Sequence, residues 1–177
     1  MRFVDLLKST VLLSAASATL LGVLTVAGAQ VDDDTTLVVF AAVWWVVAAS
    51  IGAAVGRRAQ VTPPIERVLR EAKSTTSLPE QRPGLILVNR LWPLILSTIV
   101  AAAVGLVVPQ VAAVATGFGL IWSLAWRRQD AAVSAIEDRD GATFYVQRTS
   151  PVRPIQLVRA PGFRSEVPRA DRAGTGA

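Results

Sequence analysis

Four carboxylates in the last third of the chain are the residues best suited by type to do chemistry. Asp130, Glu137, Asp138 and Asp140 follow closely on an apolar segment that ends at Arg127-Arg128. Carboxylates gathered at the level of lipid head groups can hold a hard cation for a membrane enzyme. Their spacing matches no metal motif, so we interpret them as a solvated helix end.

A second acidic group, Asp32, Asp33 and Asp34, lies between two apolar segments. Its carboxylates are also possible ligands for Mg²⁺ or Ca²⁺, but the spaced D-x-D-x-D-G pattern of a calcium loop is absent. We interpret it as a solvated loop between two helix ends.

The missing residue types exclude most catalytic classes. The chain contains no cysteine and no histidine, which removes thiol catalysis, the Ser-His-Asp triad and the usual ligands of zinc, copper and haem. No Asp, Glu, Lys or Arg lies well inside an apolar segment, where ion-coupled transporters usually need one. We therefore expect no enzymatic activity, cofactor or metal.

The residues from Leu37 to Gly56 organise the remaining chain. They carry no charge and are followed by Arg57-Arg58. As a helix, this segment would be roughly 30 Å long, the thickness of a bilayer's hydrocarbon core. The arginine pair marks its cytoplasmic end by the positive-inside rule.

The same criteria predict an all-α membrane protein with a four-helix transmembrane bundle made of two hairpins. The spans are residues 9–29, 37–56, 85–108 and 111–126, joined by a cytoplasmic loop over 57–84, with both termini cytoplasmic. The first span also has the features of a cleaved signal peptide, with a site at Ala27-Gly28-Ala29, and both interpretations stay open. The fourth span is short, so a re-entrant third and fourth pair also stays open. Pro109-Gln110 is the expected turn between them.

Two smaller elements are expected on the cytoplasmic side. Ile65, Val68, Leu69 and Ala72 have the spacing of one helix face, which predicts a short amphipathic helix on the membrane surface or across the helix ends. Residues 1–128 thus form the membrane domain. Residues 129–164 form a helix extension and a β-hairpin with strands at 142–147 and 155–159, and residues 165–177 form a disordered tail.

A lone hairpin is only marginally stable in water, so we expect it to pack on the helix ends, the membrane or another chain. The residues expected to dock a partner are Phe144, Tyr145, Val146, Ile155 and Leu157.

Each predicted span carries small residues at four-residue spacing, which lets helix backbones approach within lipid. These helix-packing positions are Ser14, Ala18, Gly22, Ala48, Gly52, Gly56, Ser97, Ala101, Gly105, Ala115, Gly119 and Ser123. Packing inside the bundle and self-association through Gly52 and Gly56 are the two interpretations.

Arginine and tryptophan side chains are expected at the cytoplasmic lipid interface, against anionic head groups. They are Arg57, Arg58, Arg90, Trp92, Trp122, Trp126, Arg127 and Arg128. The bases are scattered through several segments, although the net charge is +5, so we expect no nucleic-acid binding. The excess of Arg over Lys, with abundant Ala and Val, suggests a bacterial genome and hence the inner membrane.

Three functions remain as hypotheses. The first is a non-catalytic integral membrane accessory or scaffold protein whose cytoplasmic tail docks a protein partner. The second is a small transporter of lipids or other hydrophobic molecules, using an apolar groove near Trp44 and Trp45. The third is a membrane enzyme that uses the acidic residues from 130 to 140.

Overall fold

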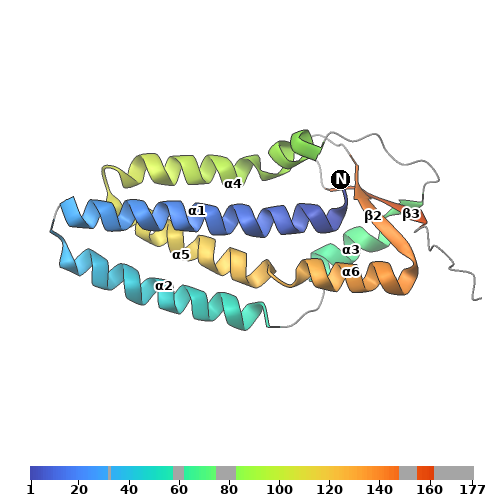
Figure 1. Cartoon of the computed structure of the whole chain (residues 1–177), viewed down its shortest axis with the longest axis horizontal. Helices are drawn as coiled ribbons and strands as arrows, with labels where there is room; N and C mark the ends of the chain where they lie inside the picture. Colours follow the sequence, from blue (N-terminus) through green and yellow to red (C-terminus); the bar gives the residue numbers. More distant parts are fainter. Residues whose placement is uncertain (32, 58–61, 75–82, 148–154, 162–177) are drawn as a thin grey trace, which may run out of the picture.

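The computed structural model describes residues 1–31, 33–57, 62–74, 83–147 and 155–161, and the tail 165–177 lies outside these ranges. The described chain is mostly helical, with one small sheet (Figure 1). Its elements in order are α1 (Phe3–Val31), α2 (Thr35–Val55), α3 (Pro63–Arg70), β1 (Lys73–Ser74), α4 (Pro83–Gly105), α5 (Pro109–Trp126), α6 (Gln129–Asp140), β2 (Ala142–Val146) and β3 (Leu157–Pro161).

Helix α5 is the central helix of the long, helical part of the molecule. It packs against α1, α2 and α4, and lies between α1 and α2 in Figure 1. The residues it buries are small: Ala112, Ala113, Thr116, Gly117 and Ser123. Helices α1 and α2 contact each other little. The predicted pair of hairpins is therefore revised, because α5 separates the two helices of the first hairpin.

Three of the described helices are long and apolar enough to cross a membrane: Phe3–Val31, Thr35–Val55 and Gly84–Gly105. This agrees with the prediction of a membrane protein. Helix α5 is not among them, because it begins with Pro109 and Gln110 and contains two glycines, which lower its hydropathy.

The helix ends differ from the prediction at two places. Helix α1 begins at Phe3, well before residue 9. The turn after α4 lies at Leu106–Val108, whereas the expected turn residues Pro109 and Gln110 form the start of α5. Proline fits the first helical turn because its missing N–H has no partner there in any case. Helix α4 continues through Pro93.

The second body of the molecule lies at one end of the long helices, and we call it the end module. It comprises residues 1–7, α3, α6, the three strands and the first turn of α4 (Figure 1). Its sheet has the order β1-β3-β2, with β2 and β3 antiparallel and β1 parallel to β3. The backbone N–H of Val146 donates to the carbonyl of Met1 at 3.0 Å, so the N-terminal residues flank β2.

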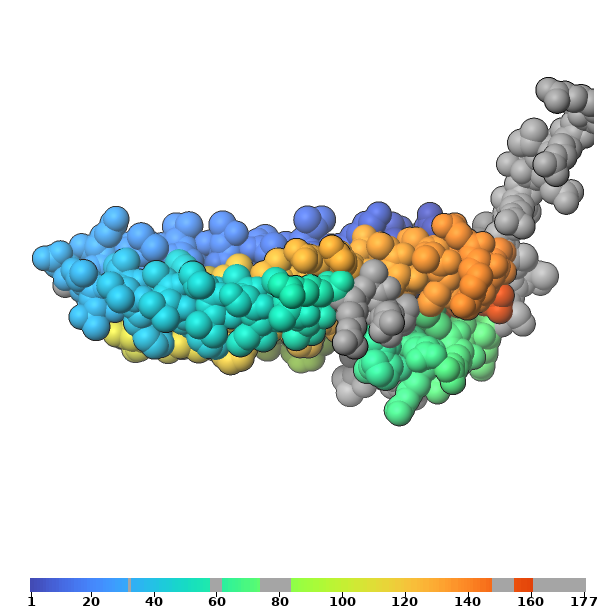
Figure 2. All heavy atoms as spheres, turned by 90° about the horizontal axis from the view of Figure 1, so that it is seen from below, coloured from blue at the N-terminus to red at the C-terminus, as the bar shows by residue number. Residues whose placement is uncertain are grey.

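The end module has its own apolar core. Its buried members are Phe3, Val4, Leu6, Leu7, Ile65, Ile86, Val133, Phe144, Val146 and Leu157. Figure 2 shows α3 and α6 together at this end, with α2 extending away over the near face. Four of these residues belong to the first turns of α1, which precede the predicted span.

This core corrects the expected docking role of the hairpin. The side chains of Phe144, Val146 and Leu157 are buried within the molecule, with 3%, 0% and 3% of their surface exposed. They face the chain's own core and are not free to contact a partner. Tyr145 and Ile155 are partly exposed. Of the three surroundings considered for the hairpin, the structure places it on the helix ends.

The amphipathic helix α3 lies across the same core. Its Ile65 is buried, and Val68 and Leu69 pack beside it. Helix α6 is also more than an extension of α5, because a turn at Arg127-Arg128 separates the two helices. Gly141 ends α6 in the left-handed conformation, with φ of 59°, as the predicted Asp140-Gly141 turn requires.

Candidate functional site

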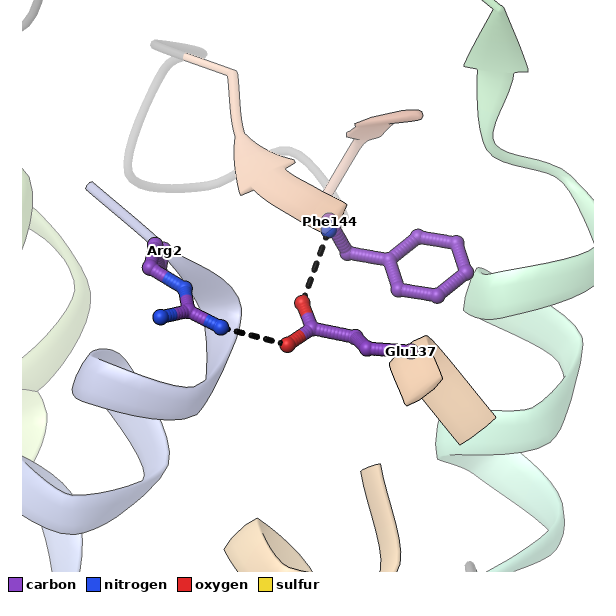
Figure 3. A network of polar contacts seen from close by, with 3 residues as sticks. All are labelled: Arg2, Glu137 and Phe144. Carbon is purple, nitrogen blue, oxygen red and sulfur yellow. Dashed lines mark hydrogen bonds and ion pairs between the residues drawn. The ribbon is translucent and has the colours of Figure 1, made fainter. Parts of the chain in front are cut away.

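Glu137 is the buried member of the predicted acidic group, and its carboxylate has a structural role (Figure 3). Its Oε2 accepts a hydrogen bond from Nη2 of Arg2 at 2.8 Å, and its Oε1 accepts one from the N–H of Phe144 at 2.8 Å. The hydrogen bond to Glu137 is the largest cause that raises the pKa of Arg2 above its ordinary value. This carboxylate joins the chain start, α6 and β2.

The remaining carboxylates of the group do not converge. Asp138 is exposed, and Asp140 pairs with Arg139 at 2.8 Å, a hydrogen bond that lowers the pKa of Asp140. In the loop before α2, Asp34 caps the helix by accepting from the N–H of Leu37 at 3.0 Å. Among the described residues, no three acidic side chains lie together where they could hold a metal ion.

Trp44 and Trp45 anchor α2 to α5. The indole N–H of Trp44 donates to the carbonyl of Val114 at 3.1 Å, and that of Trp45 donates to Ala113 at 2.9 Å. The ring of Trp44 also meets Phe118 edge-on at 5.8 Å. An indole among apolar groups needs such an acceptor for its N–H. These tryptophans belong to the interface between α2 and α5. They do not line the groove of the molecule, which lies between α1, α4 and α5.

The glycines of α2 allow α5 to approach very closely. A Cβ on Gly52 would lie 2.9 Å from Cβ of Leu124 and 3.0 Å from the backbone of Ile121. A Cβ on Gly56 would collide with the carbonyl oxygen of Leu124. The face considered for self-association is thus covered by α5 within the same chain. Ala48, on the same face, is fully buried.

The other predicted packing positions divide into two sets. Gly22, Gly105 and Gly119 pack against neighbouring helices, and a Cβ on Gly105 would lie 2.7 Å from that of Ala112. Ser14, Ala18 and Ser123 are buried. A second, overlapping set lines a cavity: Ala18, Ser97, Ala101, Ala115 and Gly119.

This cavity is a groove between α1, α4 and α5, which we call the α4 groove. Its volume is about 970 Å³. The walls from α1 and α4 are formed mainly by Thr10, Ser17, Leu21, Leu94, Thr98 and Ala101. Small side chains on facing helices leave this space unfilled, and the lining is mostly apolar. A groove of this size matches the upper end of the range for ligand sites, roughly 300–1,000 Å³.

Aromatic residues and one cation complete the groove toward the end module. Phe118, Trp122 and Trp126 line it from α5, and Trp122 and Trp126 stack at 5.6 Å. Phe3, Pro64, Val68 and Ile155 close it on the module side. Among the described lining residues, Arg90 carries the single charge.

Helix α4 is the least buried of the three helices that are apolar enough to span a membrane. In its apolar segment 6% of the residues are buried, against 17% in α2 and 33% in α1. Ile86 holds one end of α4 in the module core, and Gly105 holds the other end against Ala112. Between them, the hydroxyls of Thr98 and Ser17 form a hydrogen bond of 3.0 Å. The helix therefore borders the groove without filling it.

The predicted lipid-interface residues lie at the end of the long helices that adjoins the module. Arg57, Trp92, Trp122, Arg127 and Arg128 are exposed, and Trp126 is half-buried. Arg128 donates to the carbonyl of Arg57 at 2.9 Å. Arg58 lies outside the described residues.

Sequence reasoning missed the α4 groove, although its signal was present in part. The four-residue spacing of Ser97 and Ala101 predicts a packing face. In the structure these two residues line the α4 groove beside α5. Comparison with protein families, with curated proteins and with solved structures gives no match for this chain. The α4 groove is therefore the feature of the molecule from which we infer a function.

Proposed function

We propose that this chain is a multi-pass protein of a bacterial inner membrane. In this arrangement α1, α2, α4 and α5 cross the bilayer as a four-helix bundle, and the end module and both termini are cytoplasmic. The charges support the direction: Arg57, Arg127 and Arg128 adjoin the module, whereas Asp33 and Asp34 lie at the opposite helix ends. Since the chain has no cysteine, labelling Asp33→Cys and Arg139→Cys variants in intact cells tests it, and labelling of only Arg139→Cys would contradict it.

Within this topology, we propose that the protein binds and handles a lipid or another hydrophobic molecule without catalysing a reaction. The observation that carries the proposal is the α4 groove, with its volume of about 970 Å³ and its apolar walls. Apolar side chains that line a groove gain dispersion contacts from an apolar molecule that lies against them. A ligand with acyl chains supplies such contacts.

Filling the groove tests the proposal. We expect Ala101→Trp, which places an indole in the groove, to remove most of the lipid that copurifies with the protein in mild detergent. Ala42→Trp, on the exposed face of α2, is the matched control and should keep it. The lipid per mole of protein is measured by mass spectrometry after extraction. Wild-type protein without bound lipid, or equal lipid in all three proteins, would contradict the proposal.

A second candidate is the accessory or scaffold role, now through the outer surface of the end module. It is favoured by a folded surface beyond the long helices (Figure 1). Arg139 and Arg159 are exposed there. The double variant Arg139→Glu/Arg159→Glu should lose a crosslinked protein partner and stay folded, with a slightly lower unfolding temperature because the pair of Arg139 with Asp140 is removed. An unchanged set of crosslinked proteins would remove this candidate.

A further inference from the structure

We propose that the α4 groove holds one acyl chain of a membrane phospholipid lengthwise. The methyl end of the chain lies near the turn between α4 and α5, and the head group lies at the level of the end module. This inference depends on the proposed function and narrows it to one class of ligand in one orientation. The groove is closed at one end, is as deep as one leaflet and is open along one side. A thin, flexible chain fits a space of this shape, whereas a compact ring system does not reach its narrow end.

The groove is closed where α4 and α5 meet at the turn Leu106–Val108. A Cβ on Gly105 would lie 2.7 Å from that of Ala112, so the two helices leave no room for a chain at this point. Ala101 and Ala115, which line the groove nearest to the turn, lie about one helical turn from this contact. From the turn, α4 and α5 diverge toward the end module (Figure 1). The groove is therefore narrow at its closed end and wider near the module.

The depth of the groove matches one leaflet. Its lining runs from Arg90 to Ala101 on α4 and from Ala115 to Trp126 on α5. Each range corresponds to a helical rise of roughly 16 Å, and half the thickness of a hydrocarbon core is about 15 Å. On α1 the lining continues to Phe3, in the core that closes the groove on the module side. An acyl chain of ordinary length therefore extends from the head-group level to the closed end without crossing the midplane.

Three of the hydroxyl groups that line the groove have partners within their own helices. The hydroxyl of Thr10 donates to the carbonyl of Leu6 at 2.8 Å. Those of Ser97 and Thr98 donate to the carbonyl of Leu94, at 2.9 and 2.8 Å. A hydroxyl that donates to its own helix does not need a polar group of a ligand. The walls between the closed end and the head-group level thus suit hydrocarbon.

The open side of the groove gives the chain its orientation. Phe118 and Trp122 line the groove, and 60% and 50% of their surface is exposed, so this side faces lipid in the proposed topology. A chain can enter there from the neighbouring leaflet, but a polar head group cannot follow it to the closed end, where it would be buried among apolar side chains. Trp122 also stacks on Trp126 at 5.6 Å, and tryptophan prefers the boundary between hydrocarbon and head groups. The head group therefore lies at the module end and the methyl group lies at the turn.

Photocrosslinking in vesicles tests the inference with the full-length protein. Two phosphatidylcholine probes of equal chain length carry a diazirine, one at the methyl end of a chain and the other next to its carbonyl. Val43, which is 60% exposed, is the internal reference. It lies at the depth of Ala115, because the adjacent Trp44 bonds to Val114. We expect the methyl-end probe to label Ala115 more than Val43, although Ala115 is only partly exposed, and the carbonyl-end probe to label Trp126 and not Ala115. Mass spectrometry of peptides maps the labels.

Filling the closed end provides the second measurement. Ala101→Trp should lower methyl-end labelling of Ala115 below that of Val43. Unchanged labelling of Val43 shows that this variant is inserted and folded. Val39→Trp, on the exposed face of α2, is the matched control and should keep the wild-type labelling of Ala115.

The outcomes separate the inference from the proposed function. Labelling of Ala115 above Val43 by both probes to the same extent overturns the orientation and leaves the hydrophobic function standing. Stronger labelling of Ala115 by the carbonyl-end probe overturns the orientation as well. Labelling of Ala115 no higher than that of Val43 by either probe overturns the proposed function together with the inference. Labelling of Ala115 that Ala101→Trp does not change comes from outside the groove and also overturns both.

Discussion

Helices α2 and α4 lie against the same central helix, and they contact it in different ways. Helix α2 places Gly52 and Gly56 against the backbone of α5 and adds two indole hydrogen bonds. Helix α4 contacts its neighbours at Ile86, Thr98 and Gly105 and borders the α4 groove. Both helices carry small residues at four-residue spacing. This spacing gives close packing at Gly52 and Gly56 of α2, beside the tryptophan anchors, whereas on α4 it does so at Gly105, at one end of the helix.

The largest expected effect tests the tight side. A methyl group on Gly56 collides with the backbone of α5, whereas Gly84, near the start of α4, has open space around it. We expect Gly56→Ala to destabilise the protein by up to about 3 kcal/mol, the upper end for overpacking. Gly84→Ala should be neutral or slightly stabilising, because alanine favours a helix. Thermal unfolding in detergent compares them, and equal stability of the two variants would break the comparison between the two sides.

The next effect tests what holds α4. Glu137→Ala removes the acceptor of both Arg2 and the N–H of Phe144, and we expect a loss of about 2 kcal/mol. Because Ile86 belongs to the module core, hydrogen exchange should rise in the first turns of α4 and stay unchanged in α2. Asp138→Ala, at the neighbouring exposed position, is the control. Faster exchange in α2 than in α4 would contradict the prediction that Glu137 stabilises the start of α4 through the module core.

A smaller effect isolates one tryptophan anchor. Trp45→Phe keeps an aromatic ring and removes the hydrogen bond to the carbonyl of Ala113. We expect a loss of about 1 kcal/mol in unfolding free energy. Trp92, on α4, is 44% exposed, and Trp92→Phe should change stability less. If both variants lose the same stability, the indole bond does not distinguish the two sides.

The smallest effect concerns an exposed ion pair of the end module, away from both helices. The hydrogen bond from Arg139 lowers the pKa of Asp140 in the folded state. The pair therefore stabilises the fold above the ordinary pKa of the carboxyl and loses this effect as the pH falls through the lowered value. Asp140→Asn should unfold at a slightly lower temperature than wild type at pH 7, and the difference should vanish in strong acid. A difference that grows in acid would show the opposite sign.

Much of the helical part could be predicted because its signals are local. The uncharged segment before Arg57 and the apolar residues of α1 and α4 give the candidate spans directly. The central place of α5 could not be predicted, because its composition resembles that of α1 and α4. Only its contacts with α1, α2 and α4 distinguish it.

The end module and the groove could not be predicted, since both depend on distant residues. Arg2 meets Glu137 across most of the chain, and neither residue indicates the other. Strand β1 has only two residues and pairs in parallel with β3, so it has no turn or alternation of its own. The α4 groove is a space between three helices. Its volume depends on the separation of Thr10, Thr98 and Trp122 and not on any one of them.

The core of the end module also sets the order of biogenesis. It joins Phe3 to Leu157, which is made much later than Phe3. A ribosome adding about 5–20 residues per second needs on the order of ten seconds to reach β3. Until then the apolar start of α1 lies uncovered, although its membrane segment has already been synthesised. The core of the end module is thus completed only when β3 has been made, and a chain stalled before β3 presents an uncovered apolar patch to chaperones and proteases.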